Sequence, residues 1–342
     1  MRGFARSLIG IIILALIGGY YYFYEVRYRG EKLKEKEKSR KIYPLEKANI
    51  CKIIYQHDGK KIILEKNGAD WLIKSPISAK ADNKEVGTFV DTLSGIKVFR
   101  TLQDAKCDDP EFGLKKNPVI ITFVNKKGIW ARATFGKVNP TDSYFYTRRG
   151  EDQKVLLAWI YPKKLLQKSL YDFRVKKVLS IPSSDVTEIR IYRKGTTINL
   201  RKTGVHTWKL EAPIKAKGDR YTIEGFISSL VGEKVVRFLD TPPKDPETFG
   251  FEKPRLKISL TIKSSTAKKP GTPSSGKNTM EKIITLLTGK DRDAGHLYVK
   301  VTGSPSVMIV KKSFFKNADK KLFDLRDKNV WDFDTDTITH IK

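Results

Sequence analysis

The feature that most constrains this chain is an internal repeat. The segment that begins at Trp71 returns about 137 residues later, at Trp208. The same order of residue types follows each tryptophan: Trp71-Leu72-Ile73-Lys74-Ser75-Pro76-Ile77 against Trp208-Lys209-Leu210-Glu211-Ala212-Pro213-Ile214. With 342 residues, the chain is long enough for two domains with cores of their own. The repeat therefore predicts two copies of one fold.

Upstream of each tryptophan, the pattern predicts a β-hairpin. Apolar residues alternate with polar ones, a glycine interrupts them, and the alternation resumes. With one gap, a Tyr, a Gly, an Ile and a Leu correspond: Tyr55, Gly59, Ile62 and Leu64 against Tyr192, Gly195, Ile198 and Leu200. Each copy is therefore expected to begin with antiparallel strands.

Downstream, each copy has the spacing of a helix with one buried face. Apolar residues recur at i, i+3, i+4 and i+7: Val86, Phe89, Val90 and Leu93 in the first copy, and Ile223, Phe226, Ile227 and Leu230 in the second. Asp82 and Asp219 precede these runs and are the expected N-caps. Glu85 is expected to complete a capping box with Asp82, whereas Thr222 stands at its place in the second copy.

A second shared motif combines Asp, Pro and Glu with a following Gly. Asp109-Pro110-Glu111 precedes Gly113, and Asp245-Pro246-Glu247 precedes Gly250. Asp-Pro-Glu is a helix-start signal and glycine is a stop signal, so one short helical turn is expected before a strand. The copies close similarly, on Leu170-Tyr171-Asp172-Phe173-Arg174 and on Leu322-Phe323-Asp324-Leu325-Arg326.

These repeats predict the α+β class. We expect two mostly antiparallel β-sheet domains, each with a packed amphipathic helix, over residues 46–181 and 182–342. Residues 264–280 are rich in Ser, Pro, Gly and Lys and predict a flexible insertion between two strands. The structural positions of the repeat are Trp71, Pro76, Asp82, Pro110, Gly113 and Arg174 in the first copy, and Trp208, Pro213, Asp219, Pro246, Gly250 and Arg326 in the second.

Residues 7–24 contain no charge and predict a transmembrane helix ahead of the domains. As a helix they would span about 27 Å, close to the thickness of a bilayer core. A cleaved signal peptide is the alternative, but a cut after Gly19 would place the large Ile17 third-last. Long C-terminal domains cross a membrane largely regardless of charge. We therefore expect a single-pass membrane protein, with residues 1–6 cytoplasmic, a charged stalk over residues 25–45, and extracytoplasmic domains.

The net charge is strongly positive, at +29 from 67 Lys and Arg against 38 Asp and Glu. Such an excess favours anionic partners such as phospholipid headgroups or acidic glycans. A nucleic-acid partner is disfavoured because the lysines are scattered, without aromatic residues interleaved on one face. The other interpretation is that most lysines keep a β-rich protein soluble and guard its strand edges.

The order of the repeat motifs resembles the domain of unknown function family 4340. It runs from Trp and Pro through a helix, the Asp-Pro-Glu turn with Phe-Gly, a Gly-Lys strand and a Tyr-rich strand to the Leu-x-Asp-x-Arg end. The resemblance covers about residues 53–333 in two copies. It implies a single-span envelope protein, often encoded beside ABC transporter components of the gliding-motility type. No catalytic residue is established for that family, so the resemblance implies no site residue.

The residues do not predict an enzyme, a cofactor or a metal site. The four histidines lack ligand spacing: His57, His206, His296 and His340. No nucleophile elbow, dinucleotide fingerprint or Walker A motif occurs, and the pairs Gly136-Lys137 and Gly289-Lys290 are expected to be turn residues. Cys51 and Cys107 leave open one disulfide bond or two thiols.

Two functions follow from these patterns. The expected anchor and tandem domains, without catalytic groups, predict an extracytoplasmic accessory or scaffold protein. The family resemblance implies a protein of the bacterial inner membrane that is an auxiliary component of an ABC-type transport or gliding-motility-like complex and acts by binding integral membrane proteins. The charge supports the alternative, a tethered binder of anionic polymer or lipid.

Overall fold

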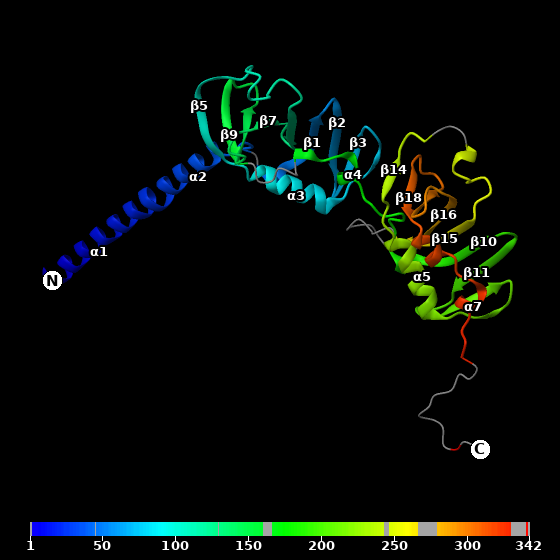
Figure 1. Cartoon of the computed structure of the whole chain (residues 1–342). Helices are drawn as coiled ribbons and strands as arrows, with labels where there is room; N and C mark the ends of the chain where they lie inside the picture. The colour runs from blue at the N-terminus through cyan, green and yellow to red at the C-terminus, as the bar shows by residue number, and fades with distance from the viewer. Residues whose placement is uncertain are drawn as a thin grey trace. The chain divides into compact units, whose positions relative to one another are not determined.

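The chain divides into two compact units, Met1–Arg174 and Val175–Lys342, in a computed structural model (Figure 1). The structure describes residues 2–44, 46–128, 130–159, 166–242, 246–265, 279–329 and 340. Each unit contains one antiparallel sheet of nine strands and one long amphipathic helix. The expectation of two antiparallel α+β domains is confirmed.

The first sheet has the strand order β4-β3-β2-β1-β6-β7-β8-β9-β5. Its strands are β1 Ile50–His57, β2 Lys60–Asn67, β3 Asp70–Ser75, β4 Ala79–Lys80, β5 Val98–Lys106, β6 Val119–Asn125, β7 Trp130–Val138, β8 Tyr144–Arg149 and β9 Lys154–Trp159. Helix α3 (Asn83–Ser94) connects β4 at one edge to β5 at the other, so it crosses the sheet (Figure 1). The short helix α4 (Leu170–Phe173) closes the unit.

The second sheet repeats this order as β13-β12-β11-β10-β15-β16-β17-β18-β14. Its strands are β10 Val186–Arg193, β11 Thr196–Lys202, β12 Trp208–Ala212, β13 Ala216–Lys217, β14 Arg237–Leu239, β15 Leu256–Ser265, β16 Thr279–Asp291, β17 His296–Val301 and β18 Val307–Lys311. Helices α5 (Arg220–Gly232), α6 (Ser313–Ala318) and α7 (Leu322–Leu325) complete it. Every strand of the first sheet thus has a counterpart in the same place.

The helices bury the faces that their spacing predicts. The buried residues of α3 include Val86, Phe89, Val90 and Leu93, and those of α5 are Ile223, Phe226, Ile227 and Leu230. Full burial of such a side chain contributes roughly 1.5–3 kcal/mol. A smaller cluster around Phe112, Tyr146 and Val155 lies on the other face of the first sheet, because neighbouring residues of a strand, such as Phe145 and Tyr146, point to opposite faces.

The hairpin alignment that matches Tyr55 with Tyr192 is wrong. Gly59 and Gly195 occupy the same turn position, with φ of 70° and 85°, and the flanking strands pair without a gap. Tyr55 therefore corresponds to Ile191, and both are buried. Tyr192 is 44% exposed, because a shift of one residue moves a side chain to the opposite face of the sheet.

The charged stalk ends earlier than residue 45. Ile42 and Tyr43 are fully buried in the first core. The backbone N–H of Ile42 donates to the carbonyl of Ile96 at 2.9 Å, and the Tyr43 hydroxyl donates to the carbonyl of Ile121 at 3.1 Å. These residues form a strap that belongs to the first domain.

The second domain has the same strap, so it begins ahead of the expected boundary at residue 182. The N–H of Val178 donates to the carbonyl of Glu233 at 3.0 Å, and the N–H of Val235 donates to the carbonyl of Lys176 at 2.7 Å. Val178 lies in the second core. Residues 175–181 therefore belong to the second domain.

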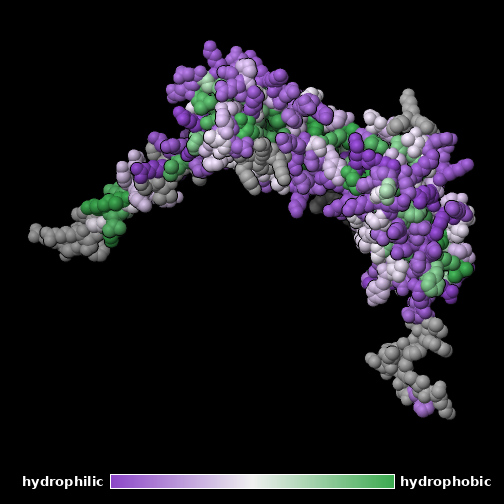
Figure 2. All heavy atoms as spheres, in the orientation of Figure 1, coloured by the Kyte–Doolittle hydropathy of each residue, from purple (hydrophilic) through white to green (hydrophobic). Residues whose placement is uncertain are grey.

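The N-terminal helical segment consists of α1 (Arg2–Tyr21), a π-helical stretch (Tyr22–Tyr28) and α2 (Arg29–Ser39). Apolar side chains of α1 are exposed and appear green in Figure 2. Within the described part of the chain, no helix combines the length and the apolar character needed to cross a membrane. The expected anchor includes residues 7–9, whose side chains lie outside the described residues.

The insertion joins two neighbouring strands. β15 and β16 pair as far as Ser265 and Thr279, so the strands extend slightly into the expected loop of residues 264–280. Residues 266–278 lie outside the described residues, and so do residues 330–339 of the second copy.

Candidate interaction surface

The start of α3 joins residues that are distant in sequence. Asp82 caps the helix, because its Oδ1 accepts from the backbone N–H groups of Lys84 and Glu85 at 3.0 and 3.2 Å. Its own N–H donates to the carbonyl of Phe173 at 2.8 Å, beside an isolated antiparallel bridge between Ala81 and Arg174. The repeat positions Asp82 and Arg174 therefore meet where the domain closes.

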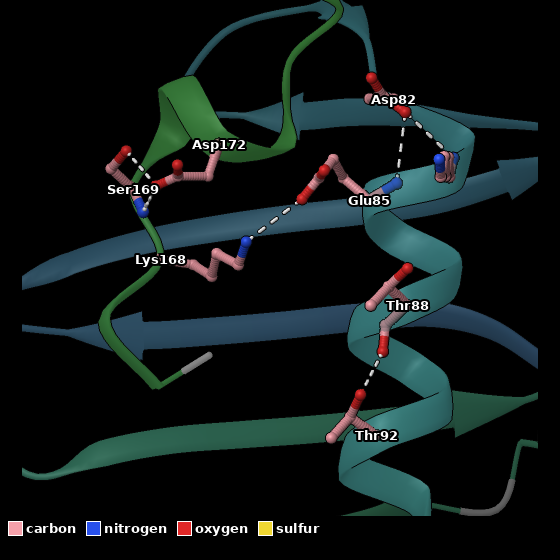
Figure 3. A network of polar contacts seen from close by, with 8 residues as sticks. Asp82, Glu85, Thr88, Thr92, Lys168, Ser169 and Asp172 are labelled. Carbon is pink, nitrogen blue, oxygen red and sulfur yellow. Dashed lines mark hydrogen bonds and ion pairs between the residues drawn. The ribbon is translucent and has the colours of Figure 1, made fainter. Parts of the chain in front are cut away.

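The capping box expected between Asp82 and Glu85 is wrong. Figure 3 shows the Glu85 carboxylate paired with the ammonium of Lys168, at 3.2 Å. The N–H of Asp82 is already taken by the end of α4, so it is not available to Glu85. The capping box instead lies in α4, where Asp172 accepts from the N–H and hydroxyl of Ser169 at 2.7 and 2.6 Å.

The second copy repeats this closure. Asp219 accepts from the N–H of Thr222 at 2.7 Å, and its own N–H donates to the carbonyl of Leu325 at 2.9 Å. Gly218 and Arg326 form the corresponding bridge. Hydrogen bonds from the hydroxyl and N–H of Thr222 lower the pKa of Asp219.

The repeated tryptophans occupy equivalent buried places. Trp71 and Trp208 are 7% and 2% exposed. The carbonyl of each accepts from the N–H of the residue before the helix-capping aspartate, at 3.0 and 2.9 Å. The peptide bonds that precede Pro76 and Pro213 are both cis. These four positions therefore have matching backbone geometry in the two copies.

The Asp-Pro-Glu turn packs on the Gly-Lys strand. In the first copy, the N–H of Lys137 donates to the carbonyl of Phe112 at 2.9 Å, and its ammonium donates to the carbonyl of Pro110 at 3.1 Å. Gly113 has a φ of 65°, which favours glycine. A Cβ on Gly136 would collide with the carbonyl oxygen of Phe112. Gly136 and Lys137 therefore both fix the position of the turn against the strand.

In the second copy, Lys290 makes the same contacts. Its N–H donates to the carbonyl of Phe249 at 2.8 Å, and its ammonium donates to the carbonyl of Glu247 at 3.0 Å. Gly250 has a φ of 72°, and a Cβ on Gly289 would collide with the carbonyl oxygen of Phe249. Cationic side chains that bond the free carbonyls of a helical turn stabilise it.

The polar residues considered for chemistry are spread over the fold. Within the described ranges, no group of three or more His, Cys, Asp or Glu residues is arranged to hold a metal ion. Asp109 accepts from the N–H of Glu111 at 2.8 Å, which is a capping contact, while Asp245 lies outside the described residues. Cys51 and Cys107 are free thiols, and burial raises the pKa of Cys107.

An aromatic cluster lies on the surface of the first domain and was not predicted. We define the aromatic trio as Phe99 on β5, Tyr144 on β8 and Trp159 on β9. Phe99 stacks on Tyr144 with ring centroids 4.4 Å apart, and the Trp159 centroid lies 5.0 Å from Tyr144 and 6.1 Å from Phe99. Phe99 and Trp159 are each 51% exposed. Two half-exposed rings packed around the partly buried Tyr144 form a contiguous apolar surface.

The second copy does not contain this cluster. Tyr144 pairs with Trp159 across β8 and β9, and the matching pair across β17 and β18 is His296 with Lys311. Val98 and Val235 make equivalent hydrogen bonds to the straps of their domains, so Val236 is the residue that corresponds to Phe99. The same fold therefore forms with valine, histidine and lysine at these positions, so packing alone does not require the aromatic trio.

The trio lies at the edge strand of the first sheet, where the strap pairs with the start of β5. β5 has nine residues and is the last strand in the order, whereas its counterpart β14 has three. The N–H of Val98, beside Phe99, donates to the carbonyl of Arg40 at 2.7 Å, and Lys97 pairs with Glu37 of α2 at 3.1 Å. The edge strand, the trio and the end of the stalk are therefore neighbours.

The fold defines a protein of two tandem α+β domains with one topology. The chain belongs to the family described as Domain of unknown function (DUF4340), whose sequence model matches residues 71–254 and residues 208–342. Both matches begin at the repeated tryptophan, Trp71 or Trp208. No curated protein and no solved structure matches the chain.

Proposed function

We propose that this protein is a membrane-anchored, extracytoplasmic accessory or scaffold protein of the bacterial inner membrane. It acts by binding as an auxiliary component of an ABC-type transport or gliding-motility-like complex. The observation that supports a binding role is the aromatic trio at the edge strand of the first sheet. Its partner is an integral membrane protein of that complex.

The exposed area of the trio is large enough to contribute to affinity. Phe99 and Trp159 are half exposed, so their burial at an interface would stabilise a complex by about 0.8–1.5 kcal/mol each. Together they would tighten binding by about 10–100-fold. Aromatic anchors of this kind often dominate the energy of an interface. β5 is the last strand of the sheet, and its part beyond the strap contact at Val98 adds backbone groups to which an extended partner segment can bond.

The N-terminal segment supports the anchored location. Apolar side chains of α1 are exposed from Ile11 to Ile17. The exposed Tyr20, Tyr21, Tyr22 and Tyr24 follow, as in the aromatic belt at a membrane surface. Full-length protein is expected to remain in the membrane fraction after high-salt and alkaline washing, and deletion of residues 1–26 is expected to release it. A washed-off full-length protein would refute the anchor.

The trio is tested by giving the first domain the residues of the second. The triple variant Phe99→Val, Tyr144→His, Trp159→Lys retains side chains that this fold accepts at the same positions. We expect this variant to fold. The amount of partner that co-purifies with it from solubilised membranes should fall at least about tenfold, and the variant should fail to complement loss of the wild-type protein.

A matched control is Trp130→Ile. Trp130 is 58% exposed in the same domain, and Ile283 stands at its place in the second copy, 64% exposed. The control removes an exposed tryptophan away from the trio, so partner recovery should be unchanged. Equal recovery with the triple variant and with wild type would refute the trio as the contact surface.

A further inference from the structure

A basic pocket lies at one corner of the first domain. It has a volume of about 290 Å³, and its lining includes His57, Asp58, Lys60, Lys61, Lys115 and Asn117. β1 pairs with both β2 and β6, so the turn of the first hairpin lies beside the residues that precede β6. Two segments that are separate in sequence therefore form its walls.

The charges of this pocket are poorly neutralised by the protein. Neither Lys60 nor Lys61 makes an ion pair with any residue that the structure describes. The Lys115 ammonium lies 3.6 Å from Asp108, but both side chains are mostly exposed, so that pair contributes little. Among the described residues of the lining, Asp58 is the one acidic residue. The lining therefore carries three lysines against one aspartate, and this excess of positive charge favours an anion.

One polar atom of the lining is buried and has no partner. The Nδ1 of His57 makes no hydrogen bond among the described residues. Arg193 occupies the corresponding position in the second copy, where it pairs with Asp319 at 3.2 Å and donates to the carbonyl of Lys320 at 3.1 Å. The second copy therefore satisfies this position internally, and the first copy does not.

The lysines are not required by the fold. Lys60 and Lys61 pair with His57 and Gln56, and the residues with the same pairing in the second copy are Thr196 and Thr197. The hairpin thus forms equally well with threonine at both positions. Lysine at these two positions is specific to the first domain, whereas the second hairpin carries Arg193 and Lys194 in place of His57 and Asp58.

We propose that this pocket binds a phosphate group. Lysine ammonium groups bind phosphate as point charges, and a doubly charged phosphate gains more from a net positive lining than a singly charged carboxylate does. The volume lies at the small end of ligand pockets, so it suits one anionic group with little attached. The phosphate belongs to a small soluble ligand or to a lipid headgroup. This site is independent of the aromatic trio.

The test uses full-length protein in a neutral detergent. Calorimetric titration with inorganic phosphate, at constant ionic strength and with chloride as reference, measures binding of the free anion. Native mass spectrometry with phosphatidylglycerol against phosphatidylcholine measures retention of an anionic lipid. The variant is Lys60→Thr, Lys61→Thr, which carries the residues of the second copy. The control is Lys74→Thr, Lys80→Thr, which removes the same charge from exposed positions on β3 and β4.

We expect the pocket variant to weaken binding at least tenfold and the control to change it less than twofold, with equal melting temperatures. If the pocket variant loses binding of inorganic phosphate, the ligand is a soluble phosphate compound. If it loses retention of phosphatidylglycerol alone, the ligand is a lipid headgroup. Two results would overturn the proposal: equal binding by the pocket variant and the control, or no binding of either probe by wild type.

Discussion

Gly136 provides the sharpest test of how each domain is held together. Its Cα faces the Asp-Pro-Glu turn so closely that a Cβ would meet the carbonyl oxygen of Phe112 and lie 3.0 Å from the carbonyl carbon of Gly113. The obstacle is backbone and not the end of a flexible side chain, so Gly136→Ala must displace the turn.

The expected cost can be worked out from these contacts. Overpacking of this kind costs about 1–3 kcal/mol. The displaced carbonyl accepts the N–H of Lys137 at 2.9 Å, and loss of that bond adds about 0.5–1.5 kcal/mol. The total is about 1.5–4.5 kcal/mol of unfolding free energy. At about 2–4 °C per kcal/mol for a domain of this size, the transition of the first domain should fall by about 3–18 °C.

Scanning calorimetry of the full chain measures both domains together. Gly289→Ala should produce the same loss in the second domain, because its Cβ would meet the carbonyl oxygen of Phe249. The control is Gly87→Ala within α3, where a Cβ would meet no atom within 4 Å. Alanine is favoured over glycine in a helix by about 0.8–1.0 kcal/mol, so this variant should raise the transition. Equal melting of Gly136→Ala and wild type would refute the packing of the turn on this strand.

Three further changes test the fold. Tyr43→Ala should cost about 3–5 kcal/mol in urea unfolding, because the ring is fully buried, whereas a stalk residue would cost almost nothing. Trp71→Ala and Trp208→Ala should each cost about 3–5 kcal/mol and lower only the calorimetric transition of their own domain. The ammonium of Lys312 holds the pKa of Asp291 below its usual range, so this ion pair stabilises above about pH 4 and is lost as the pH falls through the folded pKa. The stability difference between wild type and Asp291→Asn should therefore shrink as the pH falls below about 4, and a difference that does not change with pH would contradict the ion pair.

The repeat and the helices could be predicted because packing sets their spacing. A helix that buries one face must place apolar residues at i, i+3, i+4 and i+7, and both copies do so. The sequence also predicted the Asp-Pro-Glu turn, but it did not predict which segment packs against the turn. The supporting segments are Gly136-Lys137 and Gly289-Lys290. They are distant from the turn in sequence, so no local pattern encodes this contact.

The domain starts were missed because the apolar signal there is short. Ile42 and Tyr43 are the buried residues of the first strap, and they directly follow the basic residues Arg40 and Lys41 in sequence. The one available signal was the second copy, where Lys176-Lys177-Val178-Leu179 corresponds to Arg40-Lys41-Ile42-Tyr43. The hairpin error has a similar cause, since matching two tyrosines by identity ignored the period-2 rule that fixes which face each occupies.

The aromatic trio could not be recognised from the sequence because its three residues lie on three strands. Alternation alone would place Tyr144 and Tyr146 on one face of β8. Whether that face is covered depends on the packing of residues 107–114, which shield Tyr146 and leave the trio exposed. Surface chemistry formed by distant segments therefore becomes visible only once the topology is known.

The two copies together separate stability from function. A residue that both domains keep, such as Gly136 with Gly289, meets a demand of the fold, and its replacement acts through unfolding. A surface feature that only one of the two domains has is not required for this fold to form. The aromatic trio and the paired lysines of the hairpin are of this kind, and both belong to the first domain, whose strap continues from the N-terminal helices. Exchange of residues between the copies is therefore a more informative perturbation than alanine scanning, because each exchanged side chain already has a folded precedent in the same chain.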